Sequence, residues 1–292
     1  LIKQNGKLKI KNISLAGTGG QCLMSPPELI DGKMPYVLYN LGGVILNVIT
    51  SLIFIVIYLI SLWKLLSLAM IMSAIMGFAS AVVNGIPMKV GDINNDGYNA
   101  VQLGSDKDAL KALWVQLKMN GALAEGIGIR EMPEEWFESI DGKNDNPMIT
   151  SIKVFYCNRL MAMHKFEQTK EEIKKVLESN MVLVGVYRYL LICDYIYCEL
   201  IDGNIIEAEE FYTKDLQKFM KSMKKFPAIL RTKYTYELLH NKDSKQAEKL
   251  RTLFNIMSEK YPYTSDIEAE NELMDIAKSI YDGVMDNKIN KK

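Results

Sequence analysis

The chain has 292 residues, enough for one large domain or two ordinary ones, and its 35 basic and 35 acidic residues leave no formal net charge. This balance excludes the basic footprint of a nucleic-acid-binding protein. The four cysteines have no metal-binding spacing such as C-x-x-C. Cys193 and Cys198 stand in an aromatic, apolar run, which predicts buried thiols and a reducing compartment.

The first segment, residues 1–33, has a strand-like beginning. Apolar and polar residues alternate from Lys7 to Ile13, after an Asn5-Gly6 turn signal, which predicts a short β element. The glycines and prolines of the following "AGTGGQCLMSPPE" preclude a regular helix. We therefore expect a strand and loop segment that flanks a membrane.

Two long uncharged runs follow, and Lys64 is the only charged residue between Lys33 and Lys89. A bilayer core of about 30 Å needs about 20 apolar residues in a helix, and both runs are long enough. They predict a transmembrane hairpin at roughly 37–62 and 65–86. A signal peptide does not fit, because its apolar core is shorter and lies at the N-terminus. A helical hairpin buried in a soluble protein is the alternative.

The lysines predict how this hairpin is oriented. An even number of spans places both flanks on one side of the membrane. Residues 1–33 carry five lysines and the chain after Met88 carries many more, whereas the connecting turn has only Lys64. The positive-inside rule then predicts an integral membrane protein with both flanks in the cytoplasm.

The membrane-embedded part is expected to cover residues 34–130. It includes a helix at 105–125 that begins at Ser105 or Asp106 as its cap. The acidic, turn-rich residues 131–147 are expected to be a linker to a soluble part.

The last part, residues 148–292, has a helical pattern with an internal repeat. Thr169, Ala208 and Ala247 are spaced 39 residues apart, and each is a small residue near the start of the second helix of a pair. The pattern resembles tetratricopeptide-type helical hairpins with a longer period, and an irregular helical bundle is the alternative. Concave repeat surfaces bind peptides or proteins, so a cytoplasmic protein partner is expected. The expected fold class is mainly α, with a short N-terminal β element, a transmembrane hairpin and a helical-repeat domain.

The loop "NGIPMKVGDINNDGYNA" at 84–100 breaks the apolar pattern and allows three interpretations. As a calcium loop, it places Asp92, Asn94 and Asp96 at the first, third and fifth ligand positions and Gly97 at the sixth, but a leucine occupies the twelfth. Alternatively, its Gly, Asn and Asp residues end a helix and turn the chain.

The third interpretation rests on residues around this loop. They are Gly43 and Asn47 in "GGVILN", Asn84 and Pro87 at the end of the second run, Asp96-Gly97, "SLAGTGGQC" and "MPEEWF". Over roughly residues 15–137, this set resembles the site-2 protease family of intramembrane zinc metalloproteases. A carboxylate at membrane depth is costly unless it binds something, which agrees with this resemblance.

The resemblance implies a zinc cofactor with an aspartate ligand and two histidine ligands from an HExxH helix. It also implies membrane lipid surroundings and cleavage of membrane-spanning protein substrates by a zinc-bound water. Asp96 is the expected ligand because a glycine follows it, and Asp92 is the fallback because its spacing from Asn84 is common in the family. Asn84 and Asn47 are candidate contacts to the substrate backbone or to an oxyanion.

Two departures limit what this chain can do. Val44 stands where the family has a proline, and no HExxH motif occurs anywhere in the sequence. The two histidines, His164 and His240, lie in the helical region and are expected at its surface or at helix ends. We expect a protease that is truncated before Leu1 and inactive alone. A non-catalytic, membrane-anchored helical-repeat scaffold is the alternative.

Overall fold

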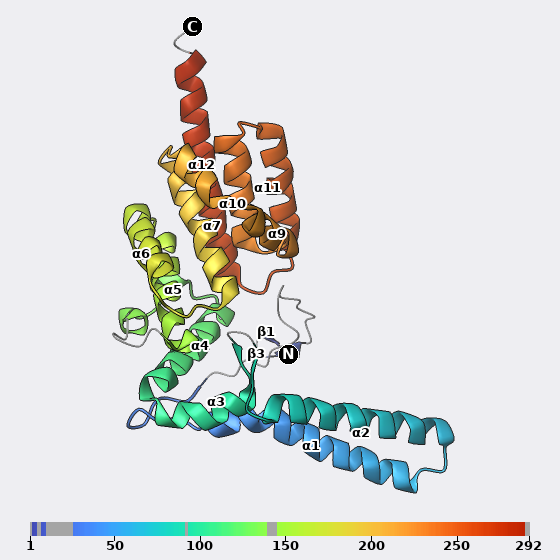
Figure 1. Cartoon of the computed structure of the whole chain (residues 1–292). Helices are drawn as coiled ribbons and strands as arrows, with labels where there is room; N and C mark the ends of the chain where they lie inside the picture. The colour runs from blue at the N-terminus through green and yellow to red at the C-terminus, as the bar shows by residue number, and fades with distance from the viewer. Residues whose placement is uncertain (1, 5–6, 10–25, 91–92, 139–144, 290–292) are drawn as a thin grey trace.

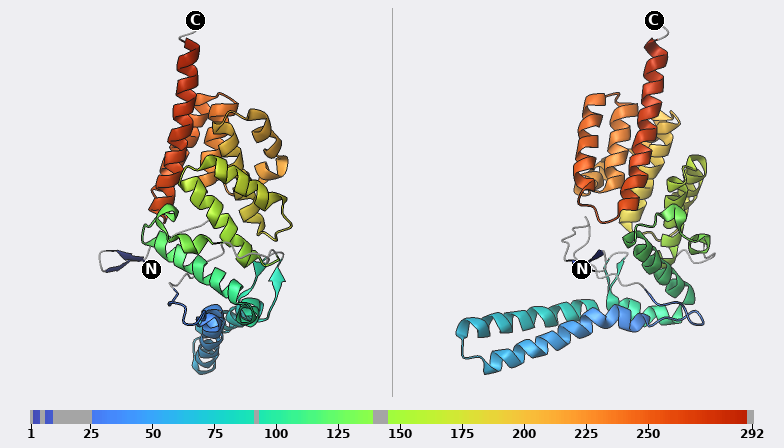
Figure 2. Two further views of the ribbon diagram at one scale, coloured as in Figure 1. Left: turned by 90° about the vertical axis from the view of Figure 1, so that its left-hand side faces the viewer. Right: turned by 180° about the vertical axis from the view of Figure 1, so that it is seen from behind.

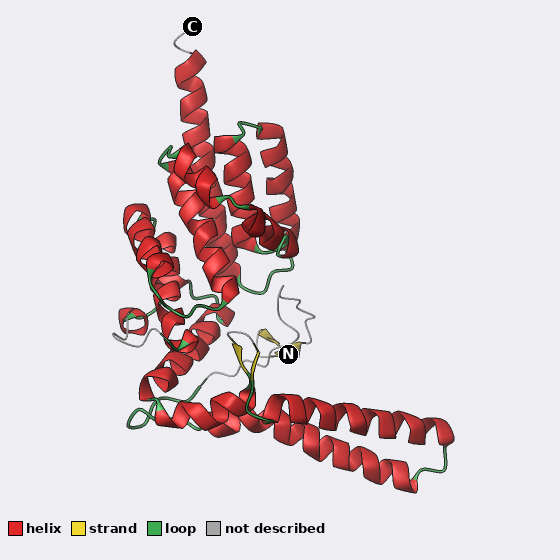
Figure 3. Cartoon of the chain, viewed as in Figure 1, coloured by secondary structure: helices red, strands yellow, loops and turns green. Residues whose placement is uncertain are grey.

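The computed structural model describes residues 2–4, 7–9, 26–90, 93–138 and 145–289. The described chain is mainly helical, as expected (Figure 3). One long helical hairpin projects from the rest of the molecule, and the later helices form a separate body beside its base (Figure 1). The two views of Figure 2 show the same division from the side and from behind.

The projecting hairpin consists of α1 (Tyr36–Ile60) and α2 (Lys64–Gly85). Both helices are long and apolar enough to cross a membrane, and at about 1.5 Å per residue both exceed the bilayer core. Only 6% and 11% of their most apolar windows are buried within the protein. The apolar side chains therefore face outward, unlike those of a hairpin in a soluble core. Which side of the membrane the flanks occupy stays a prediction.

Small residues form the contact between α1 and α2. On α2 the tightly packed positions are Ala74, Gly77, Ala81 and Gly85. A Cβ atom on Gly77 would lie 2.2 Å from the Ser51 Oγ atom of α1, and one on Gly85 would lie 2.9 Å from Val44. Small side chains at such a seam let two helix backbones approach closely in lipid.

The described N-terminal strands are short. Strands β1 (Ile2–Gln4) and β2 (Lys7–Lys9) pair antiparallel, with Ile2 opposite Lys9. An isolated two-stranded hairpin is marginal in water, and the rest of the alternating run lies outside the described residues. Two three-residue strands of this kind do not support the short N-terminal β element that the alternation over residues 7–13 predicted as part of the fold.

Short elements follow the hairpin: β3 (Lys89–Val90), β4 (Ile93–Asn94), α3 (Asp96–Gln102) and the 3-10 turn η1 (Leu103–Ser105). Helix α4 (Lys107–Ala124) begins at Asp106, whose side chain accepts hydrogen bonds from two backbone N–H groups. Two further 3-10 turns, η2 (Ile129–Glu131) and η3 (Glu134–Phe137), come next. Met132 and Phe137 are buried in a hydrophobic core that also contains residues of α4 and α5. Part of the segment 131–147, which was expected to be a linker, therefore belongs to this core.

The remaining helices are α5 (Pro147–Ala162), α6 (Phe166–Glu178), α7 (Gly185–Ile201), α8 (Ile205–Phe211), α9 (Lys214–Ser222), α10 (Pro227–Thr235), the π-helical segment η4 (Tyr236–His240), α11 (Ser244–Ser258) and α12 (Thr264–Ile289). Thr169, Ala208 and Ala247 are each the fourth residue of α6, α8 and α11. All three are fully buried. Their small side chains therefore let the second helix of each pair pack closely against its neighbours.

The turns inside these helix pairs repeat as well. His164, Gly203 and Lys242 are again 39 residues apart, and their φ angles are positive at 58°, 82° and 56°. Such a left-handed residue after a helix lets the next N–H groups bond back to the last carbonyls. The Lys165 N–H donates to the carbonyl of Leu160 at 3.0 Å in this way.

The Gly203 turn gives a stability prediction. Gly203→Ala should lower the free energy of unfolding by about 1 kcal/mol, because the left-handed conformation is costly for a residue with a Cβ. Gly283→Ala is the matched control, since Gly283 lies in α12 with open space around it, and alanine there should be neutral or stabilising. Thermal unfolding of both variants checks the prediction, and equal shifts in melting temperature would contradict it.

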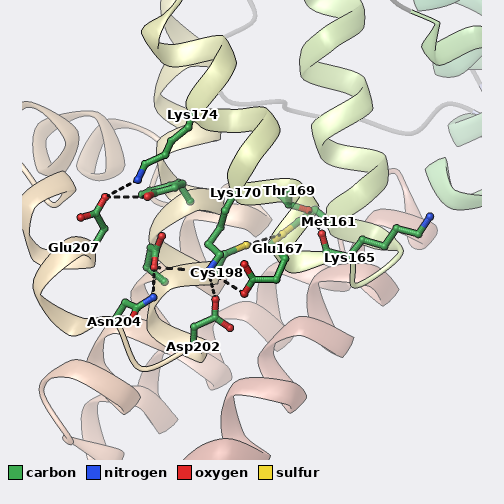
Figure 4. Close-up of polar contacts among 12 residues, drawn as sticks. Met161, Lys165, Glu167, Thr169, Lys170, Lys174, Cys198, Asp202, Asn204 and Glu207 are labelled. Carbon is green, nitrogen blue, oxygen red and sulfur yellow. Dashed lines mark hydrogen bonds and ion pairs between the residues drawn. The ribbon is translucent and has the colours of Figure 1, made fainter.

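Ion pairs join the successive helix pairs (Figure 4). Lys170 of α6 contacts Asp202 after α7 and Glu167 of its own helix, the latter at 3.1 Å. Lys174, one turn further along α6, pairs with Glu207 of α8 at 3.2 Å. These contacts link α6 to the next pair on the protein surface, whereas the buried small residues act inside the pairs.

Candidate functional site

Asn95 holds the loop after the α1–α2 hairpin in place. Its Oδ1 atom accepts hydrogen bonds from the N–H groups of Met88 at 3.0 Å and Tyr98 at 2.9 Å. Its Nδ2 group donates to the carbonyls of Val83 at 2.8 Å and Ile86 at 2.6 Å. The last carbonyls of a helix and the first N–H groups of the next lack intrahelical partners. Asn95 satisfies both kinds at once and ties the end of α2 to the start of α3.

Gly97 allows the same two elements to touch. It is buried, and a Cβ atom there would lie 2.1 Å from the carbonyl oxygen of Gly85. No other residue fits such a close approach of two backbones. Asn95 and Gly97 therefore fix the residue between them, Asp96, as the first residue of α3. We call these three residues the α2–α3 clamp.

Asp96 presents its side chain at the exposed surface of this clamp. Within the described residues its carboxylate has no hydrogen bond or ion pair. Neighbouring protein atoms partly desolvate the carboxyl group and raise its pKa above the ordinary value. Asp96 is thus held rigidly by its neighbours while its own oxygens stay available to a ligand.

The other predicted site residues are less constrained. Asp92 lies outside the described residues. Asn84 is exposed in the last turn of α2, and Asn47 is half-buried in α1. No hydrogen bond joins Asn47 or Asn84 to Asp96. The calcium-loop interpretation does not fit, because residues 96–102 are helical where an EF-hand loop needs its ligand-bearing turns.

Both histidines have local partners in the helical region. His164 occupies the left-handed turn after α5, stacks on Phe166 and lies 3.4 Å from Glu272. His240 stacks on Tyr236, and its Nδ1 atom lies 2.8 Å from the Asn241 side chain. Among the described residues, no group of three His, Cys, Asp or Glu side chains could hold a metal ion. The described part of the chain therefore does not by itself fit a zinc centre.

A second feature, which the sequence did not reveal, is a buried charge cluster. Arg231 of α10 is fully buried, and its Nε atom donates to Glu270 of α12 at 2.8 Å. Its Nη2 atom contacts Asp194 of α7. Burial raises the pKa of Asp194 to about 6, against the opposing effect of the Arg231 charge. An arginine inside the apolar run "FPAILRTKYTYELL" was the one signal of this cluster in the sequence.

Comparison with protein-family models, with curated proteins and with solved structures finds no match for this chain. The resemblance to site-2 proteases therefore rests on the quoted motifs alone.

Proposed function

We propose that residues 34–130 belong to the core of a site-2-type intramembrane zinc metalloprotease that acts on membrane-spanning protein substrates. In this proposal Asp96 is one metal ligand, and the chain alone is inactive. The α2–α3 clamp carries the proposal. The Asn95 side chain and the close approach at Gly97 hold Asp96, whose carboxylate has no partner among the described residues, beside a helix pair of bilayer length.

A catalytic zinc has three protein ligands and an open position, and the described residues offer one. We propose that two histidines come from a helix outside residues 1–292. When bound there, zinc would polarise a peptide carbonyl and activate water. Asp96 would fix the metal at the end of α2.

The two asparagines fit binding roles rather than metal binding. Asn84 has an exposed amide in the last turn of α2, at the same end of the helix as the clamp. We propose that it hydrogen-bonds the backbone of an unwound substrate segment. Asn47 is the second candidate for this role. Among the described residues, no atom lies within 4 Å of where Cβ groups on Gly42 and Gly43 of α1 would stand, so a further helix can approach closely there.

A second candidate function is a non-catalytic, membrane-anchored scaffold. The observation that favours it is the regular construction of the helical region, in which the pair turns and the buried small residues share one 39-residue spacing. In this case α1 and α2 anchor the chain in lipid, and the helical region binds a cytoplasmic protein partner.

Reading the gene upstream of the codon for Leu1 distinguishes the two candidates. The protease proposal expects an in-frame helix with a His-Glu-x-x-His motif. A stop codon or a start at residue 1, together with no histidine-bearing partner chain encoded beside it, would favour the scaffold.

A further inference from the structure

The charge cluster of Arg231, Asp194 and Glu270 forms part of the wall of a cavity of about 230 Å³. The cavity lies where α4 and α5 face α7, α10 and α12, so it joins the membrane-proximal helices to the rest of the helical region. Its apolar wall includes Leu123 and Phe155. Pockets for drug-sized ligands have volumes of about 300–1,000 Å³, so this smaller cavity suits one or two residues rather than an extended chain.

The charges in the wall do not balance. The Arg231 guanidinium already has partners within the protein, because it contacts Asp194, Glu270 and the Thr232 hydroxyl. One positive and two negative groups leave this cluster with an excess of one negative charge. A buried uncompensated charge is costly, so the cluster favours an additional cation.

Asp266, in the first turn of α12, adds a further acidic group to the same cavity. Its carboxyl group has no hydrogen bond or ion pair within the described part of the chain, and burial together with Glu270 raises its pKa to about 7. Asn158 in α5 also lines the cavity, and its side-chain amide has no hydrogen-bond partner among the described residues.

We propose that this cavity binds an ammonium group of a peptide, with a neighbouring apolar side chain of the peptide against Leu123 and Phe155. The ammonium group pairs with Asp266, and the Asn158 amide hydrogen-bonds the peptide backbone. Charge complementarity selects this ligand, since the cavity combines an unpaired carboxyl group and a net negative cluster with apolar walls. The inference does not depend on the zinc site.

The ammonium group can be the amino terminus of the peptide or a lysine side chain. Three dipeptide amides separate these sources: leucyl-phenylalaninamide, N-acetyl-lysyl-phenylalaninamide and the neutral N-acetyl-leucyl-phenylalaninamide. Binding of each at millimolar concentration to the full chain in detergent micelles is measured by calorimetry. We expect one or both cationic probes to bind, and the neutral probe to bind at least tenfold more weakly.

The binding should depend on pH in a defined direction. Glu270 on the same helix, together with Tyr261 and Tyr263 just before it, interacts electrostatically with Asp266. Arg231 on α10 and Asp194 on α7 line the same cavity. A cation pairs with the ionised carboxylate, and the empty cavity loses that form as pH falls below about 7. The affinity of the lysyl probe should therefore fall about tenfold between pH 8 and pH 6.

Asp266→Asn tests the assignment directly, because it removes the charge and keeps the shape. The substitution should weaken the binding of the cationic probes at least tenfold and abolish the pH dependence of that binding, while thermal unfolding stays cooperative. Asp282→Asn is the matched control, since Asp282 lies on the exposed part of the same helix and pairs with Lys278. Equal binding of neutral and cationic probes, no binding of either cationic probe, or unchanged binding to Asp266→Asn would overturn the proposal.

Discussion

Arg231→Ala should be among the most destabilising single changes in the helical region, with a loss of about 3–5 kcal/mol in the free energy of unfolding. The substitution removes a side chain that is fully buried and leaves Asp194 and Glu270 without their cation. Breaking a buried ion pair at one partner is costly because the remaining charges stay desolvated. Part of the loss also comes from the cation–π contact with the Tyr197 ring, 4.9 Å away.

Chemical denaturation of the full chain in detergent, followed by circular dichroism, measures this effect. Arg251→Ala is the matched control, because its partner Asp275 is 60% exposed, and the expected loss is within about 1 kcal/mol. Adding Asp194→Asn and Glu270→Gln to an Arg231→Met chain should recover much of the stability, since neutral amides cost less to bury than carboxylates. Similar losses for Arg231→Ala and Arg251→Ala would show that the cluster is not a key support of the fold.

Gly97→Ala should have the second large effect, because it acts on the α2–α3 clamp. Its new Cβ atom would lie 2.1 Å from the Gly85 carbonyl oxygen and 2.6 Å from the carbonyl carbon. Both atoms belong to the backbone, so no side-chain rotation relieves the contact. Overpacking of this kind costs about 1–3 kcal/mol, and we expect the upper end.

Gly43→Ala is the control for this change, because Gly43 lies in α1 with no atom within 4 Å of the added methyl group. Thermal melting in detergent should show a lower transition for Gly97→Ala and an unchanged one for Gly43→Ala. An unchanged melting temperature for Gly97→Ala would mean that α3 does not sit against the end of α2.

The sequence predicted the two long apolar helices well, because two long runs without charge, divided only by Lys64, define both helices and the turn between them. The expected spans of 37–62 and 65–86 differ from α1 and α2 by a residue or two at each end. The 39-residue spacing also located buried small residues in three helix pairs. The same spacing explains the backbone conformation of His164, which occupies the left-handed turn position that Gly203 occupies in the next helix pair.

The sequence did not predict two features of the structure, for different reasons. Asp194, Arg231 and Glu270 are separated by more than 35 residues at each step, so only the packing of α7, α10 and α12 brings them together. The role of Asn95 was not predicted, because the neighbouring Asp92 and Asp96 are the stronger candidates for a ligand. An asparagine directly before a helix is a strong capping signal and could have identified it. The alternating residues near the N-terminus were a weak signal, because an isolated two-stranded hairpin is marginal in water.

The zinc content of the full-length natural gene product is the decisive test of Asp96 as a metal ligand. The measurement compares the purified wild type with Asp96→Asn and with the matched variant Asp92→Asn, which alters the nearby aspartate. We expect about one zinc per chain in the wild type and in Asp92→Asn, and loss of the metal in Asp96→Asn. Full zinc content in Asp96→Asn, or no zinc in the wild type, would contradict it.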